Sequence, residues 1–295
     1  MSKFKVFIVV LIGVISVSFA SIFIKLIPQV PALVIAFYRL FLATIFISPV
    51  YALKGKRLPP DLKYEILAGL FMALHFAFWI SSLKYTSVLS SVVLVTMNPV
   101  FVGILSWIFL KEMPSLLAWI GILVSILGGF VVGYSDKLTG FGNLKGDILS
   151  ILGSIMISIY FFIGRRTRKH TELLDYVFPV YMSAAAFLYI ICLITGTQIK
   201  SYPVDVFKYF VLLAIIPQII GHTSFNWALK HTSATFVTVL ILGEPIGSAL
   251  LAYFILGEGV KALQVIGSIF ILLGIVLNYI AEGKYSRMVP DEPVI

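Results

Sequence analysis

The sequence is poor in charged residues and in cysteine. Only 12% of its residues are charged, about half the share in an ordinary soluble domain, whereas 60% are hydrophobic. A chain of this composition does not fold as a soluble globule, which excludes the soluble enzyme classes. Its single cysteine, Cys192, lies inside an apolar run. One cysteine cannot form an internal disulfide framework or a cysteine-based metal site.

The sequence also lacks the motifs that mark catalysis and ATP use. It contains no G-x-x-x-x-G-K-[ST] loop, no H-E-x-x-H and no G-x-S-x-G. We therefore expect no catalytic residues, no cofactor and no metal site. The missing phosphate-binding loop further indicates that ATP does not drive the protein directly.

The net charge of +9 does not indicate nucleic acid as a partner, because the basic residues gather in short loops between apolar runs. Such an asymmetry of lysine and arginine is the signal that orients a protein in a membrane. With the N-terminus placed in the cytoplasm, fourteen basic residues fall inside and seven outside. We therefore expect a cell-membrane protein with both termini in the cytoplasm.

Apolar runs of about 20 residues, long enough to cross a hydrocarbon core roughly 30 Å thick, follow one another along the chain. They predict an all-α polytopic membrane protein with ten transmembrane helices. The first run follows Lys3 and Lys5 as a secretory signal would, but its apolar core is too long, so we expect it to be retained. The ten runs are 5–25, 31–52, 63–83, 88–110, 116–134, 147–164, 174–195, 206–228, 234–256 and 262–281.

The two halves of the chain are related copies. Leu229–Glu258 repeats Leu83–Glu112 at a constant offset of 146 residues, with ten of thirty positions identical. A fixed offset of this kind is the mark of an internal duplication. Because each copy holds five runs, an odd number, the second copy enters the membrane upside-down, as in many secondary transporters. We expect two inverted five-helix repeats around a central cavity, residues 1–146 and 147–282, followed by a disordered cytoplasmic tail, 283–295.

Several short motifs resemble the drug/metabolite transporter superfamily, and specifically its ten-span EamA-type members. The resemblance covers nearly the whole chain and implies two inverted five-helix halves, a central cavity, alternating access and the export of small metabolites. Asn98 stands where the family often has a small residue. The motifs are Tyr38-Arg39-Leu40-Phe41-Leu42, Leu83-Lys84-Tyr85-Thr86-Ser87, Asn98-Pro99-Val100-Phe101, Leu110-Lys111-Glu112, Glu244-Pro245 and Leu256-Gly257-Glu258.

Pro99 and Pro245 occupy matching positions midway along runs in the two copies. Each proline removes a backbone donor and displaces the carbonyl four residues earlier, at Val95 or Ile241. In lipid such carbonyls need partners, so the kinks should face protein or a wet cavity. Paired broken helices predict gating kinks that form the site. A static kink is the alternative.

Glu244 is the one acid deep within a predicted span, and Arg39 is the one deep cation. Ionisable groups at this depth are costly and indicate function. Glu244 would bind a substrate amine or carry a coupling proton. Arg39 would serve as a structural or coupling charge. In the structural alternative, Glu244 and Arg39 pair and lock two helices together, or cap the kinked backbone. Asn98, the repeat counterpart of Glu244, offers an uncharged amide as a further substrate-binding group.

Polar and aromatic side chains share helix faces in three other runs. Gln218, His222 and Asn226 recur every four residues, as do His75 and Trp79. We expect these stripes to bind substrate, together with Tyr160 beside a stripe of serines. The alternative is that they join helices through hydrogen bonds. The serines of that stripe are Ser150, Ser154 and Ser158.

Small residues on two further runs predict close helix packing, within the chain or between protomers. They are Gly121, Ser125 and Gly129 in the fifth run, and Gly267 and Gly274 in the tenth. At the ends of two runs, Glu112 and Glu258 are explained by helix capping and contact with water.

Together these features favour a secondary transporter of small metabolites, amino acids or related amphipathic solutes, with export by alternating access. Its partners would be a small-molecule substrate and the lipid bilayer, with proton coupling left open. A non-transporting receptor or scaffold is one alternative, and an intramembrane enzyme, which lacks its motifs here, is another. The sequence does not determine the oligomeric state.

Overall fold

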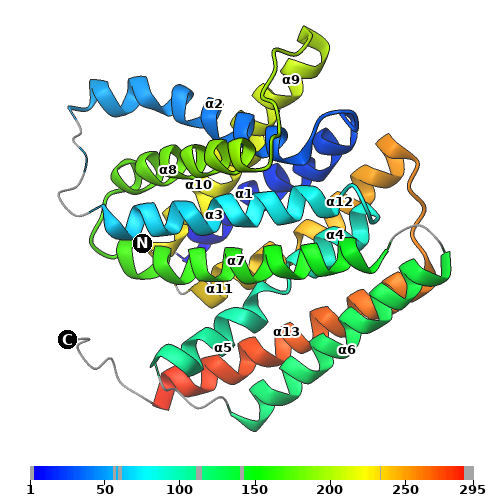
Figure 1. Cartoon of the computed structure of the whole chain (residues 1–295). Helices are drawn as coiled ribbons and strands as arrows, with labels where there is room; N and C mark the ends of the chain where they lie inside the picture. Colours follow the sequence, from blue (N-terminus) through cyan, green and yellow to red (C-terminus); the bar gives the residue numbers. More distant parts are fainter. Residues whose placement is uncertain are drawn as a thin grey trace.

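The computed structural model describes residues 3–55, 58, 62–110, 115–139, 143–232 and 234–288, and every regular element within these ranges is a helix (Figure 1). The first half contains α1 (Lys3–Lys25), α2 (Ala32–Leu53), α3 (Lys63–Ser82), α4 (Val88–Val95), α5 (Asn98–Leu110) and α6 (Leu116–Thr139). The second half contains α7 (Leu144–Arg168), α8 (Leu173–Ile194), α9 (Val204–Leu213), the π-helix η1 (Ala214–His222), α10 (Thr223–Leu229), α11 (Ala234–Ile241), α12 (Glu244–Leu251), the π-helix η2 (Ala252–Leu256) and α13 (Ala262–Met288).

Helix occupies all ten predicted runs, but not every run is one long apolar helix. Seven helices of the described chain are long and apolar enough to cross a membrane. In the remaining three runs the described apolar stretches are shorter, at Trp119–Val132, Glu244–Leu256 and Ala262–Gly274. The protein is therefore a multi-pass helical membrane protein, whereas the count of ten spans stays a prediction. α13 continues to Met288, into the predicted tail, and residues 289–295 lie outside the described part.

Two of the predicted runs break at their prolines. α4 ends at Val95 and α5 begins at Asn98-Pro99, while α11 ends at Ile241 and α12 begins at Glu244-Pro245. Val95 and Ile241, the last residues of α4 and α11, are thus the residues whose carbonyls Pro99 and Pro245 displace. Proline is well placed in the first turn of the following helix, where its missing N–H would have had no partner.

The eighth predicted run contains a change of helix type that the sequence pattern did not indicate. Residues 214–222 form the π-helix η1 between α9 and α10, and Pro217 lies inside it. A π-helix shifts the register of the side chains that follow, and such segments often occur at functional sites. Here η1 carries Gln218 and His222, so the expected four-residue stripe is held on a widened helix.

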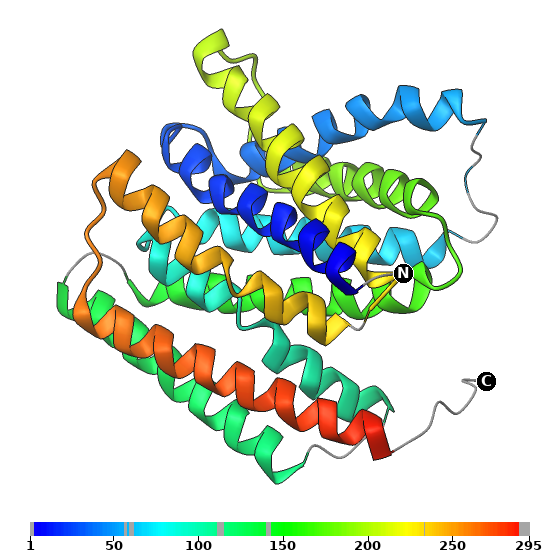
Figure 2. The ribbon, with the colours of Figure 1, turned by 180° about the vertical axis from the view of Figure 1, so that it is seen from behind.

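α6 and α13, which correspond to the fifth and tenth predicted runs, pack side by side along their length (Figures 1 and 2). Gly121 meets Gly274 and Gly128 meets Gly267, so the two helices run antiparallel. Ser125 Oγ donates to the Ile271 carbonyl at 3.3 Å within the same interface. The predicted small faces therefore pack internally. Gly129 is the exception, because it faces Leu94 and Met97 instead.

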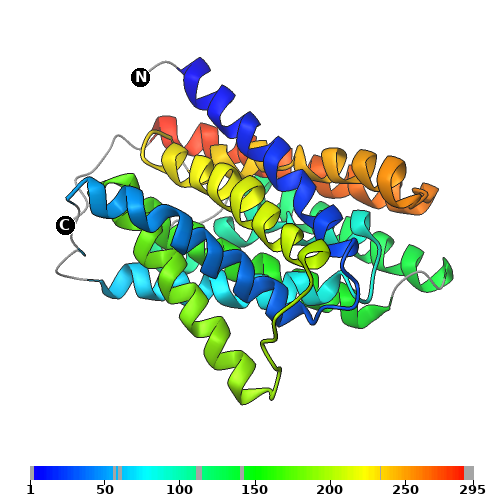
Figure 3. The same ribbon diagram turned by 90° about the horizontal axis from the view of Figure 1, so that it is seen from above.

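The two ends of the described chain lie on the same side of the molecule. α1 begins and α13 ends at one end of the helix bundle, at the left in Figures 1 and 3. At the opposite end, the Lys25 ammonium lies 3.5 Å from Glu258 Oε1, and Glu258 Oε2 accepts from the Val88 N–H at 2.9 Å. Glu258 thus caps α4, as expected for a residue at the end of a run, while Glu112 lies outside the described residues.

Candidate substrate-binding site

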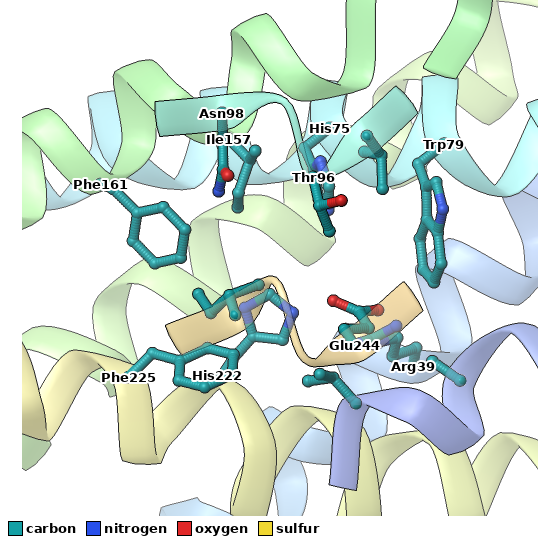
Figure 4. Close-up of a pocket in the computed structure, with 14 residues that line it drawn as sticks. Arg39, His75, Trp79, Thr96, Asn98, Ile157, Phe161, His222, Phe225 and Glu244 are labelled. Carbon is teal, nitrogen blue, oxygen red and sulfur yellow. The ribbon is translucent and has the colours of Figure 1, made fainter. Parts of the chain in front are cut away.

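A cavity lies between the two halves of the chain, at the point where both broken helices turn (Figure 4). It holds about 420 Å³ of empty space, its open side included. Its lining comes from both halves: Val17, Ala20, Arg39, His75, Trp79, Val95, Thr96, Asn98, Ile157, Phe161, His222, Phe225, Ile241 and Glu244.

The two helix breaks face each other across this cavity (Figure 4). Asn98 is the first residue of α5 and Glu244 the first of α12, and both side chains line the cavity. Asn98 is 3% exposed and Glu244 8%. The repeat relationship therefore places an amide and a carboxylate at equivalent positions. Each break also brings two helix ends of opposite partial charge to the cavity, the C-terminus of α4 or α11 and the N-terminus of α5 or α12.

Arg39 reaches the cavity from α2 and is completely buried. Its Nε donates to Gln218 Oε1 at 2.8 Å, and its guanidinium carbon lies 4.1 Å above the centre of the Phe76 ring. Among the described contacts, no ion pair joins Arg39 to Glu244, although both line the same cavity. The predicted alternative of a structural lock therefore does not take the form of a direct pair; Arg39 is held by an amide and an aromatic face.

His75 and Trp79 lie together on α3 and both line the cavity. Their rings stack with centroids 5.9 Å apart. His75 Nδ1 lies 2.9 Å from the Gly153 carbonyl on α7, which fixes the imidazole. A side chain at Gly153 would press on Trp79, because a Cβ there would lie 3.2 Å from Trp79 Cβ. Because Gly153 has no side chain, α7 leaves room for the rings of His75 and Trp79.

Of the stripe of Gln218, His222 and Asn226, one residue lines the cavity and two lie behind its wall. Only His222 lines the cavity. Gln218 lies behind it against Arg39, and Asn226 lies deeper, donating to the His222 carbonyl at 2.9 Å. Tyr160 is buried and donates to Asn226 Oδ1 at 2.7 Å, and it does not line the cavity. Contact of Tyr160, Gln218 and Asn226 with a substrate stays a prediction.

The serine stripe of α7 fastens the broken helix of the first half. Ser158 Oγ donates to the Asn98 carbonyl at 3.2 Å, and Ser150 Oγ donates to Ser91 Oγ at 3.4 Å. Both bonds join α7 to the α4–α5 segment. Ser150 and Ser158 thus attach α7 to both half-helices, α4 before the break and α5 after it.

Several lining residues were not singled out from the sequence. Thr96 lies in the turn between α4 and α5, and the apolar walls include Phe161 and Phe225. Phe225 stands 146 residues after Trp79, so the repeat offset applied to Trp79 leads to it. Thr96 and Phe161 carry no comparable signal, because apolar and small polar residues are abundant throughout the chain.

Four of the lining residues each have a buried polar atom without a hydrogen-bond partner: Arg39 Nη1, Trp79 Nε1, Asn98 Oδ1 and His222 Nδ1. Buried polar groups are almost always bonded, so a group of unbonded ones requires an explanation. They come from four different helices and meet at one cavity. This is the pattern of a site whose ligand supplies the missing partners.

A helical membrane protein with two related halves and a polar cavity between them belongs to the class of membrane transporters. The model of the EamA-like transporter family matches residues 4–134 and 144–280, one match per half. The chain therefore belongs to the EamA-like transporter family.

Similar proteins in other organisms are also named as transporters. An uncharacterized transporter of Clostridium kluyveri is 26% identical over 270 residues, which is 88% of this chain and 86% of the relative. One from Archaeoglobus fulgidus is 25% identical over 87% of this chain and 91% of its own length. A solved crystal structure superposes with a TM-score of 0.69 over 96% of this chain and 99% of the other, at 17% identity. That likeness shows the fold alone.

Proposed function

We propose that the protein is a secondary transporter that exports small metabolites, amino acids or related amphipathic solutes, across the cytoplasmic membrane by alternating access. The observation that carries the proposal is the cavity between the halves, with four unpartnered polar atoms on its lining residues. A small solute of mixed polarity fits it, since apolar side chains such as Phe161 and Phe225 form part of the walls.

The proposed architecture is ten spans in two oppositely inserted five-helix units, 1–146 and 147–282, with both termini in the cytoplasm. Two observations support it. α6 and α13, the fifth helices of the two units, run antiparallel. α1 begins and α13 ends on the same side of the molecule, as an even number of crossings requires (Figure 1).

In the proposed mechanism, the two halves rock about the helix breaks at Pro99 and Pro245 and expose the cavity to each side in turn. Short half-helices joined by turns rearrange at less cost than one long helix, because fewer backbone hydrogen bonds have to change. Glu244 binds the positively charged end of the solute. Whether Glu244 also carries a coupling proton is a separate question, which the dependence of transport on pH decides.

Flux across sealed vesicles tests the proposal. Purified protein is reconstituted with a panel of amino acids, nucleosides, sugar phosphates and amines, and counterflow of labelled solute is measured at two pH values. Counterflow of at least one solute, weakened in Glu244→Gln, is expected. Binding of a solute without any flux would instead indicate a receptor, and conversion of a solute without flux would indicate an enzyme. A flux that is equally insensitive to pH in both proteins excludes proton coupling.

A further inference from the structure

We infer that Arg39 is the anion-binding group of the cavity, that Gln218 positions it, and that the solute carries a single negative charge of the carboxylate kind. This inference rests on the proposed function and refines the site it uses. It differs from the structural or coupling role that sequence reasoning assigned to Arg39.

The guanidinium of Arg39 is restrained on one edge and one face only. Its Nε is bound to Gln218 Oε1, and one face lies on Phe76 at 4.1 Å. Nη1 is buried and has no partner. An arginine presents five N–H donors in a fixed plane, and in this arrangement those on Nη1 are unused. A carboxylate oxygen can accept from such a donor.

A purely structural role does not explain an unused donor on a fully buried cation. Burying a charge is costly, and structural buried charges are therefore paired and fully hydrogen-bonded. In the described part of the chain, Arg39 has no ion-pair partner, although the carboxylate of Glu244 lines the same cavity. The chain thus holds a desolvated cation with a donor, Nη1, that the one carboxylate of the cavity does not satisfy.

Gln218 is fixed in an orientation that suits this task. Its amide oxygen accepts from Arg39, and its amide nitrogen lies 3.7 Å from the sulfur of Met72. Met72 and Gln218 are 146 residues apart, so they are repeat counterparts that meet at the centre of the molecule. Gln218 is completely buried and lies on η1, whose altered register brings it to Arg39. It acts on the solute through Arg39 and is a positioning residue.

The charged groups of the cavity provide one place for a negative charge on the solute, beside Arg39. Arg39 is the only cation among the described residues of the lining, and Glu244 the only acid. The formal charges cancel, and at each break the positive N-terminus of α5 or α12 lies beside the negative C-terminus of α4 or α11, so the helix ends add little net charge. Trp79 Nε1 is a further unpartnered donor. The single negative charge of a carboxylate is matched by the single cation, Arg39. A phosphate with two negative charges would leave one of them without a cation.

The test compares solutes that differ only in charge. L-amino acids and their carboxamides, of nearly equal size, are titrated against purified full-length protein by thermal shift, with phosphate esters as a further arm. For at least one pair we expect the carboxylate to bind about 10-fold or more tightly than the carboxamide. Arg39→Gln removes the difference and Arg39→Lys reduces it. Arg166→Gln, an exposed arginine outside the cavity, retains it.

Gln218→Leu tests positioning. The matched control is Gln264→Leu, at a buried glutamine that binds Ser87 and Ser90 and does not line the cavity. We expect Gln218→Leu to lower the ratio of carboxylate to carboxamide affinity and to leave carboxamide affinity nearly unchanged. Equal weakening of both compounds would show a merely structural role. If no carboxylate in the panel binds the wild type better than its carboxamide, or phosphate esters bind best, the inference is overturned.

Flux of the same compounds separates the inference from the proposed function. Transport that does not depend on the negative charge contradicts the inference and leaves the transporter intact. Binding that depends on both charge and Arg39, without flux in sealed vesicles, contradicts the proposed function and leaves the anion site.

Discussion

Gly128 and Gly267 touch through their backbones at the interface of α6 and α13. A Cβ added at Gly128 would lie 2.6 Å from the Gly267 carbonyl oxygen, and one at Gly274 would lie 2.3 Å from the Gly121 carbonyl oxygen. Because Gly121 and Gly267 are repeat counterparts, as are Gly128 and Gly274, the two contacts exchange under the repeat. The interface therefore has a local two-fold symmetry, which is what an inverted duplication produces.

This symmetry predicts that the interface does not tolerate larger side chains. Gly128→Val is expected to destabilise the protein by about 1–3 kcal/mol, because overpacking forces the two backbones apart. Thermal unfolding in detergent measures it. Gly129→Ala is the control, since a Cβ there meets Leu94 and Met97 at an ordinary 3.6 Å. Equal loss of stability in both variants would contradict close packing at Gly128.

Glu244 is predicted to be needed for transport and dispensable for folding. Glu244→Gln keeps the shape and removes the charge that faces the solute, and transport should fall about 10-fold or more, the usual effect of losing a charged hydrogen bond. Initial rates in vesicles give the measurement. Glu172→Gln changes an exposed carboxylate paired with Lys230 at the surface and should transport normally. Wild-type rates in Glu244→Gln would remove this residue from the site.

The proline breaks are predicted to matter for rate. Pro245→Ala restores a backbone donor at the break, which allows α11 and α12 to join into one helix and moves Glu244 from its place in the cavity. A misplacement of about 1 Å in a site costs up to 100-fold, so we expect transport to fall about 10-fold or more.

Pro49→Ala serves as the control for the proline variant, because Pro49 is exposed within α2, away from the cavity. Unchanged flux in Pro99→Ala and Pro245→Ala together would show that the breaks are static kinks.

Glu258 is predicted to stabilise the end of the molecule where α1, α4 and η2 meet. Its carboxylate pairs with Lys25 and accepts from the Val88 N–H at the start of α4. Glu258→Ala should cost about 1 kcal/mol, the usual effect of losing a helix cap. Asp205→Ala removes an exposed pair with Lys208 and should leave the melting temperature unchanged, since surface pairs contribute little. A comparable loss in both variants would contradict the capping role.

Features that depend on local chemistry were predictable from the sequence. The duplication, the helix breaks at Pro99 and Pro245, and the small packing faces of α6 and α13 all follow from proline and glycine at a fixed offset, although the sequence did not show that these two faces pack against each other. The repeat also indicated that Asn98 and Glu244 occupy equivalent places, and the structure brings both to one cavity.

Features that depend on tertiary packing were not predictable. The π-helix η1 arises where α9 and α10 continue through Pro217, and no periodicity in the sequence marks it. Gln218 and Asn226 share the predicted stripe with His222, but neither lines the cavity. Gln218 accepts a hydrogen bond from Arg39 instead, and Asn226 accepts one from Tyr160. Sequence spacing identifies a common helix face, but it does not give the depth of each side chain below that face.

Opposite insertion of the two halves is tested most directly by labelling repeat counterparts from each side of the membrane. Single cysteines are introduced at Lys84 and Lys230, 146 residues apart, in a Cys192→Ser background, and intact cells are treated with a membrane-impermeant thiol reagent before and after permeabilisation. The account predicts that Lys84→Cys reacts in intact cells and Lys230→Cys only after permeabilisation. Reaction of both cysteines from the same side would contradict it.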